Sequence, residues 1–299
     1  MQLSPVRINE FCNLMVDETN WGGADISVLI QIFQTVIEEF RSVSGIIPSG
    51  VLNIQPSPGF DYPLCSKTGD SYTIFLTARG NHWSQYVFQF SHEYCHYLIN
   101  GPLDGKLETS FWFEESICEL ASMFFLNRAT IRWNAYQYVE VPGVPMSSSD
   151  RVLNDLKGYV KNNQEYLRNR RNLSSGISIP LASWLEENMH SLSEPVYHRD
   201  LYNQIADSLL DLFIDNHDLW RILPYLYRPS LAEYSGFREF ITQIVPNRLT
   251  VEVEHFPLLV EVLTGDTWET TKNRDKDESQ LIPVITLNQS QLLLGKDSI

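Results

Sequence analysis

The sequence SHEYCH occupies residues 91–96 and contains an HExxH pattern made by His92, Glu93 and His96. The surrounding residues, from about 82 to 100, carry apolar side chains at helical spacing, and a Gly-Pro pair ends the pattern. Because residues four apart lie one above the other on a helix, the two imidazoles can bind one small cation. Glu93 would lie beside that cation, where its carboxylate could take a proton from water and deliver it to a leaving group.

A catalytic zinc ion usually has three protein ligands and keeps its fourth position for water, so a further ligand is required. A second apolar helix is expected from about residue 112 to 127, and a ten-residue loop would let it fold back across the first. It offers Glu114 and Glu115, which are about 100° apart around the helix, so only one can face the metal. Glu119 is one turn beyond Glu115 on the same face and could accept a hydrogen bond from a ligand imidazole.

The spacing of these residues resembles the zinc signature of the gluzincins, the thermolysin-like and aminopeptidase-like metallopeptidases. In this chain His92-Glu-x-x-His96 is followed by eighteen residues and then Glu115. The sequence WFEESICE at residues 112–119 is similar to the second-helix motif of that family, in which a Trp precedes the ligand Glu by three residues. The resemblance covers about residues 72–126, and it favours Glu115 over Glu114 as the third ligand, leaving Glu114 in solvent.

The resemblance implies a zinc-dependent peptidase with a Zn²⁺ cofactor. It implies that the zinc ligands are His92, His96 and Glu115 and that Glu93 is the general base. It also implies that Glu119 is the carboxylate that accepts a hydrogen bond from a ligand imidazole. It also implies that a strand at residues 73–77 is the sheet edge along which a peptide substrate lies. Two positions depart from the family pattern: Ser116 replaces a common Gly, and Glu119 replaces the commoner Asp.

A hydrogen-bond donor facing the developing oxyanion is also expected, and in gluzincins it is often a Tyr or His further along the chain. Tyr202 lies in a segment that resembles the downstream helix carrying such a tyrosine, which makes it the catalytic candidate. The same residue belongs to an apolar helical stripe, which is typical of a core tyrosine; the stripe also contains Ile205, Leu209 and Phe213. Tyr197 and His198 are further candidates for the same role.

The remaining pattern predicts an α+β fold, with a small mixed β-sheet packed on the HExxH helix and followed by a mostly helical lobe. An amphipathic helix is expected at 24–42, and short strands at 51–54 and 72–78. Later helices are expected at about 150–168, 180–190, 196–215 and 229–244. We expect residues 1–145 to form a zincin-like catalytic subdomain and residues 146–299 a helical lobe that completes the cleft.

Composition limits the class of partner. Lys and Arg number 22 against 37 Asp and Glu, so the net charge of −15 would repel a phosphate backbone, and we expect no nucleic-acid partner. No apolar run approaches eighteen residues, so no membrane partner is expected. Four widely spaced cysteines without a CxxC pair, and an amino terminus unlike a signal peptide, predict reduced thiols in the cytoplasm.

Three functions remain open at this stage. The first is an active zinc peptidase acting on a peptide or protein substrate, with neutral or basic peptides weakly favoured by the charge. The second is a catalytically inactive zincin-like protein that binds a peptide or a partner. The third is an interaction protein without a metal, in which HExxH arose by chance. The residues leave open whether an active enzyme would be an endopeptidase or an exopeptidase, and what its oligomeric state is.

Overall fold

The computed structural model describes most of the chain in ten ranges: 3–7, 12–47, 50–69, 71–100, 112–136, 144, 146–173, 179–194, 196–226 and 233–268. The predicted loop at 101–110 lies outside the described residues. So do the last twenty residues and most of the polar segment from 265 to 280.

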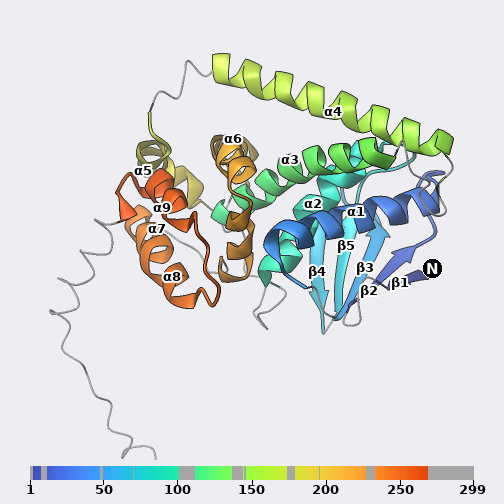
Figure 1. Ribbon diagram of the computed structural model, residues 1–299, viewed down its shortest axis with the longest axis horizontal. Helices are drawn as coiled ribbons and strands as arrows, with labels where there is room; N and C mark the ends of the chain where they lie inside the picture. Colours follow the sequence, from blue (N-terminus) through green and yellow to red (C-terminus); the bar gives the residue numbers. More distant parts are fainter. Residues whose placement is uncertain are drawn as a thin grey trace, which may run out of the picture.

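A mixed β-sheet forms one end of the molecule (Figure 1). Within the described ranges it has five strands in the order β1-β2-β3-β5-β4. The strands β2, β3 and β5 run parallel to one another, and β1 and β4 pair antiparallel at the two edges. Their bounds are β1 (Leu3–Arg7), β2 (Cys12–Asp17), β3 (Gly50–Pro56), β4 (Leu64–Thr68) and β5 (Ser71–Leu76).

The strand predicted at the sheet edge is an interior strand, so that prediction is wrong. Ile74 of β5 is paired with Ile54 of β3 on one side and with Cys65 of β4 on the other. The edge strand β4 is short and has few apolar residues, which is why its sequence gave no strand pattern. The Gly69-Asp70 pair between β4 and β5 is a hairpin signal, and Gly69 takes the positive φ of 60° that such a turn requires.

One face of the sheet is buried and the other is partly exposed. Alternate residues of β3 and β5, among them Ile54 and Ile74, are fully buried. Helix α2 (Trp83–Asn100) packs on β4 and β5, and helix α1 (Ile26–Ser44) packs on α2. The Asp25 side chain caps the start of α1 by accepting the N–H of Ser27 at 2.9 Å.

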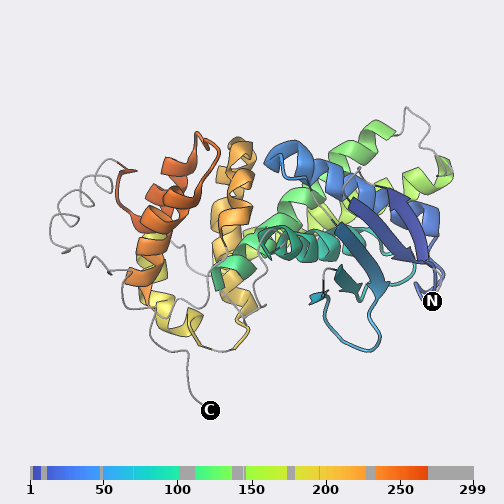
Figure 2. The same ribbon diagram turned by 90° about the horizontal axis from the view of Figure 1, so that it is seen from below.

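Helix α3 (Trp112–Ala135) connects the sheet end to the helical end and is buried along most of its length. It contacts α1, α2, α4 (Met146–Leu173) and α6 (Arg199–Asp215). The elements beyond α4 gather at the end opposite the sheet, with α6 between the two ends (Figures 1 and 2). Besides α6 they are α5 (Leu181–Leu192), a 3-10 helix (His217–Tyr225), α7 (Tyr234–Glu239), a π-helical turn (Phe240–Ile244), α8 (Val245–Arg248) and α9 (Phe256–Thr264).

The predicted α+β fold is confirmed: a small mixed sheet packs on the HExxH helix and a mostly helical part follows. Buried residues on both sides of the predicted boundary at residue 145 belong to one hydrophobic cluster. The division into two subdomains stays a prediction. None of the described helices is long and apolar enough to cross a bilayer.

Candidate metal centre

The two histidines of the HExxH pattern face each other on α2. His92 and His96 are one helical turn apart, and their Nε2 atoms are 3.2 Å from each other. Both imidazoles lie in the contact between α2 and α3, where their exposure to solvent is small. This is the arrangement that four-residue spacing on a helix predicts.

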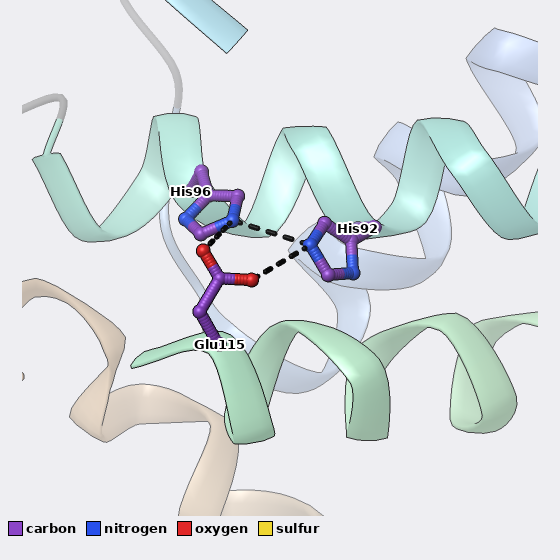
Figure 3. Close-up of side chains that lie close together, drawn as sticks. All are labelled: His92, His96 and Glu115. Carbon is purple, nitrogen blue, oxygen red and sulfur yellow. Dashed lines mark hydrogen bonds and ion pairs between the residues drawn. The ribbon is translucent and has the colours of Figure 1, made fainter. Parts of the chain in front are cut away.

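The first turn of α3 adds a carboxylate to the same point. Glu115 Oε2 lies 3.4 Å from His92 Nε2, and Glu115 Oε1 lies 3.5 Å from His96 Nε2 (Figure 3). In a tetrahedral zinc site, ligand bonds of about 2.0–2.1 Å put ligand atoms about 3.3 Å apart. The three separations match that value, and two imidazoles with one carboxylate suit zinc chemically. These residues could therefore hold a zinc ion.

The Glu115 carboxylate and the His92 and His96 imidazoles stabilise each other's charged forms. Burial alone would lower the pKa of His96, but Glu115 and Glu114 outweigh it and raise the pKa well above its usual value. Burial alone would raise the pKa of Glu115, but the two imidazoles outweigh it and lower the pKa. The centre thus combines negative charge with imidazole donors in a region from which water is largely excluded.

Glu93 lies beside the three ligand atoms and is not one of them. Its side chain is buried, lines the neighbouring cavity, and accepts a hydrogen bond from the backbone N–H of Cys65 on β4. Burial raises its pKa, although the nearby imidazoles act in the opposite direction. Glu93 therefore has the position expected of a group that exchanges protons with a water molecule or a substrate.

Glu114 has a role that the sequence did not predict. Its Oε1 lies 2.7 Å from Nδ1 of His96, and its side chain is largely buried, not in solvent. If Nε2 of His96 binds an ion, Nδ1 carries the proton and donates a hydrogen bond to Glu114. Such a hydrogen bond fixes the tautomer and the orientation of a ligand imidazole.

Glu119 contacts other side chains than the imidazole that it was expected to orient. It is 2% exposed, and its Oε1 accepts the hydroxyl of Tyr197 at 3.3 Å and lies 3.5 Å from Nε of Arg199. No hydrogen bond joins it to an imidazole among the described residues, although its charge helps to raise the pKa of His92 against the effect of burial. The hydrogen bond that Glu119 was expected to accept from a ligand imidazole is not present among the described contacts.

Tyr202 and Tyr197 occupy different environments. Tyr202 is buried with the other residues of its stripe on α6, does not line the cavity, and donates a 3.4 Å hydrogen bond to the carbonyl of Val196. The structure therefore favours the core interpretation of Tyr202. Tyr197 lines the cavity, and burial of its hydroxyl together with Glu119 raises its pKa. Its neighbour His198 contacts Glu194 and is not part of the cavity lining.

A cavity of about 800 Å³ opens beside His92, His96 and Glu115, a size in the range of small-molecule and peptide sites. Its walls come from four parts of the fold: the loop and first residues of β4, helix α2, the start of α3, and the segment from Tyr197 to Arg199. Thr77, just after β5, and Tyr159 of α4 complete the lining. The sequence predicted the α2 and α3 contributions, but not those of the β4 edge or Arg199.

We found no family model, curated protein or solved structure that matches the chain.

Proposed function

We propose that the protein is a zinc-dependent peptidase. The observation that carries the proposal is the convergence of three ligand atoms, from His92, His96 and Glu115, at separations of 3.2 Å, 3.4 Å and 3.5 Å beside a cavity. Three protein ligands leave one position for water or substrate, as in catalytic zinc sites. When bound, zinc would supply Lewis acidity, which acidifies water and polarises a carbonyl oxygen.

Glu93 would move the proton. In peptide hydrolysis, a base must take a proton from the attacking water and an acid must give one to the departing amine, and a single carboxylate can do both in turn. The Cys65 N–H holds the Glu93 carboxylate at the wall of the cavity, next to the imidazoles. Because this hydrogen bond comes from a strand backbone, it also fixes Glu93 relative to β4.

Tyr197 would donate a hydrogen bond to the oxygen that becomes negative as the peptide bond is attacked. A tyrosine hydroxyl is protonated at neutral pH, and the raised pKa of Tyr197 keeps it so. The Tyr197 side chain is half exposed at the cavity wall. In the substrate-free arrangement this hydroxyl donates to Glu119. Arg199 also contacts Glu119, so a partner for that carboxylate remains when Tyr197 turns toward a substrate.

The edge strand β4 would align an extended peptide. Among the described strands β4 pairs only with β5, and its first residues, Leu64 and Cys65, line the cavity. Peptides commonly bind by adding a strand to such an edge. The end of β5 is not available in this way, because Gln89 of α2 accepts the N–H groups of Thr77 and Ala78, each at 3.0 Å.

Metal analysis and a Glu93→Gln variant test the proposal together. Purified protein prepared without chelators should contain about one zinc per chain, and His96→Ala should contain far less. The wild type should cleave members of a mixed peptide library. Glu93→Gln should retain zinc and lose about 10²-fold or more in kcat, whereas the exposed control Glu187→Gln should match the wild type.

The outcomes separate the three functions. Zinc with activity that depends on Glu93 supports the peptidase. Zinc without cleavage of any library member favours a zincin-like binding protein. Less than a tenth of a zinc per chain, after zinc supplementation, would exclude both and favour a protein that uses no metal. Cleavage that is unchanged in Glu93→Gln would contradict the role proposed for that carboxylate.

A further inference from the structure

Carboxylates outnumber Arg and Lys side chains in the lining of the cavity. Five of its described lining residues are acidic, namely Asp61, Glu93, Glu114, Glu115 and Glu119, whereas Arg199 is the only Arg or Lys among them. A divalent ion would offset part of this charge without reversing it. Arg199 is itself engaged by the buried carboxylate of Glu119. A cavity with such walls attracts cationic groups and repels anionic ones.

Glu119 shows that this negative charge is incompletely compensated. Its side chain is 2% exposed, yet its Oε2 forms no hydrogen bond with any described residue. Most buried carboxylate oxygens in proteins have a hydrogen-bond partner. The wall around the metal ligands therefore keeps an excess of acceptors and of negative charge, which a cationic ligand would reduce.

Asp61 and Tyr62 bring an acid and an aromatic ring to the cavity from the loop before β4. No hydrogen bond or ion pair joins the Asp61 carboxylate to a described residue, so its charge is available to a ligand. Tyr62 is 60% exposed, so part of its ring is accessible to a ligand. A cation can bind to both groups, because a carboxylate pairs with it and a ring face attracts it.

The loop that carries these residues is held in place. The Ser57 hydroxyl accepts the Phe60 N–H at 2.8 Å, and the Ser57 carbonyl accepts Nη2 of Arg79 at 2.9 Å. The Phe60 ring stacks on Tyr62 and meets Phe75 of β5 edge to face, each at a centroid distance of 5.9 Å. A loop ordered before binding loses little conformational entropy when a ligand arrives.

The loop that carries Asp61 and Tyr62 lies only a few residues from Cys65, which contacts the proposed general base Glu93. Tyr62 and Asp61 precede Cys65, the residue whose N–H contacts Glu93, by three and four positions. Residues 61 and 62 lie in a bend just before β4, so the chain over that length spans at most about 10–13 Å, the extended limit. A peptide lying along β4 would therefore bring a side chain a few residues from its cleaved bond to Asp61 and Tyr62.

We propose that the cavity selects peptides carrying an arginine or lysine side chain a few residues from the cleaved bond, and that this side chain binds to the Asp61 carboxylate and the Tyr62 ring. The proposal names the substrate class of the same site and rests on the proposed peptidase function. Arginine fits best, because its planar guanidinium pairs with a carboxylate and stacks on a ring at the same time.

Peptides that differ only in charge test this selection. Arginine is placed in turn at each position within four residues of the cleaved bond and compared with citrulline, which has the same shape without the charge. At one position the arginine peptide should have a kcat/KM about tenfold higher at low salt, and the ratio should fall as salt screens the pair. Asp61→Asn should bring the ratio close to one, and Tyr62→Leu should lower it about threefold.

Asp211→Asn is the matched control, because Asp211 is an exposed carboxylate on α6 outside the cavity lining. It makes the same change in net charge and should keep the arginine preference. A loss of preference in both aspartate variants would mean that the overall charge of the protein causes it, and would overturn the role of Asp61.

Binding to the Glu93→Gln variant separates this selection from hydrolysis. Its dissociation constant for the arginine peptide should be about tenfold lower than for the citrulline peptide. Equal constants would overturn the selection even if the wild type cleaves both peptides. A tenfold difference in binding without cleavage by the wild type would support the selection and contradict the proposed hydrolysis. Binding of neither peptide would overturn both.

Discussion

Glu114 Oε1 lies 2.7 Å from Nδ1 of His96, while the adjacent Glu115 faces Nε2 of the same ring at 3.5 Å. Two neighbouring carboxylates on α3 therefore contact the two nitrogens of one imidazole on α2. One is placed as a ligand, and the other holds the ring that would also be a ligand. This arrangement explains how both residues can be close to the centre although they point about 100° apart around their helix.

Replacing Glu114 should weaken metal binding without removing a ligand. Glu114→Ala is expected to raise the zinc dissociation constant by about 10- to 100-fold, because the His96 ring loses the acceptor that orients it. Glu114→Gln keeps an acceptor oxygen and should have a smaller effect. Competition with a fluorescent zinc chelator measures both constants. Wild-type affinity in Glu114→Ala would show that the hydrogen bond does not support the centre.

Replacing Tyr197 should affect catalysis, whereas replacing Tyr202 should affect stability. Tyr197→Phe should lower kcat by about 10²-fold with little change in KM, since a single oxyanion donor is typically worth that much. Tyr202→Phe should leave kcat within about twofold and lower the free energy of unfolding by about 0.5–1.5 kcal/mol, the usual worth of one hydrogen bond. Steady-state kinetics and urea denaturation distinguish them, and the reversed pattern would restore Tyr202 as the catalytic residue.

The start of α2 depends on a residue of α4. Asp155 accepts the backbone N–H of Ser84 at 2.7 Å and so caps the helix that carries both histidines. Asp155→Ala should lower the free energy of unfolding by about 1 kcal/mol, a typical value for a lost cap. The exposed neighbour Asn154→Ala is the control in the same urea titration. Equal stability of the two variants would show that this cap contributes nothing.

A carboxylate in the helical lobe should make stability depend on pH. Burial alone would raise the pKa of Asp218, but the N–H and the ring of His255 outweigh it and lower the pKa. Its contribution is therefore complete above the unfolded pKa of about 3.9 and is lost as the pH falls through the lower folded value. Asp218→Asn should be less stable than the wild type at pH 7, and the difference should shrink on acidification. A constant difference from pH 7 to pH 3 would contradict this linkage.

The sequence predicted the part of the site that depends on local geometry. The spacing of His92 and His96 fixes their relation on any helix, and the interval to Glu115 matched a motif. The contact of Glu114 with His96 was not predictable, because it depends on how α2 and α3 cross. Tyr202 illustrates a conflict between motif and periodicity: its place in an apolar stripe indicated the core, and the structure has it there.

Contacts between residues distant in sequence account for the other features that could not be predicted. Asp155 caps a helix that begins 72 residues earlier, and no pattern within either segment indicates this contact. The edge strand β4 has only five residues, and its order in the sheet depends on pairing that a single segment does not encode. By contrast, α1 and α2 have long apolar periodicities, and both were predicted close to their observed bounds.

The outer side of β4 has a consequence for the behaviour of the protein at high concentration. A strand paired on one side only can join a strand of another molecule, and such contacts lead to aggregates. β4 is short and carries Lys67, and both features discourage that process. A bound peptide would cover the same backbone, so substrate-like ligands should protect the purified protein from precipitation as well as compete for its cavity.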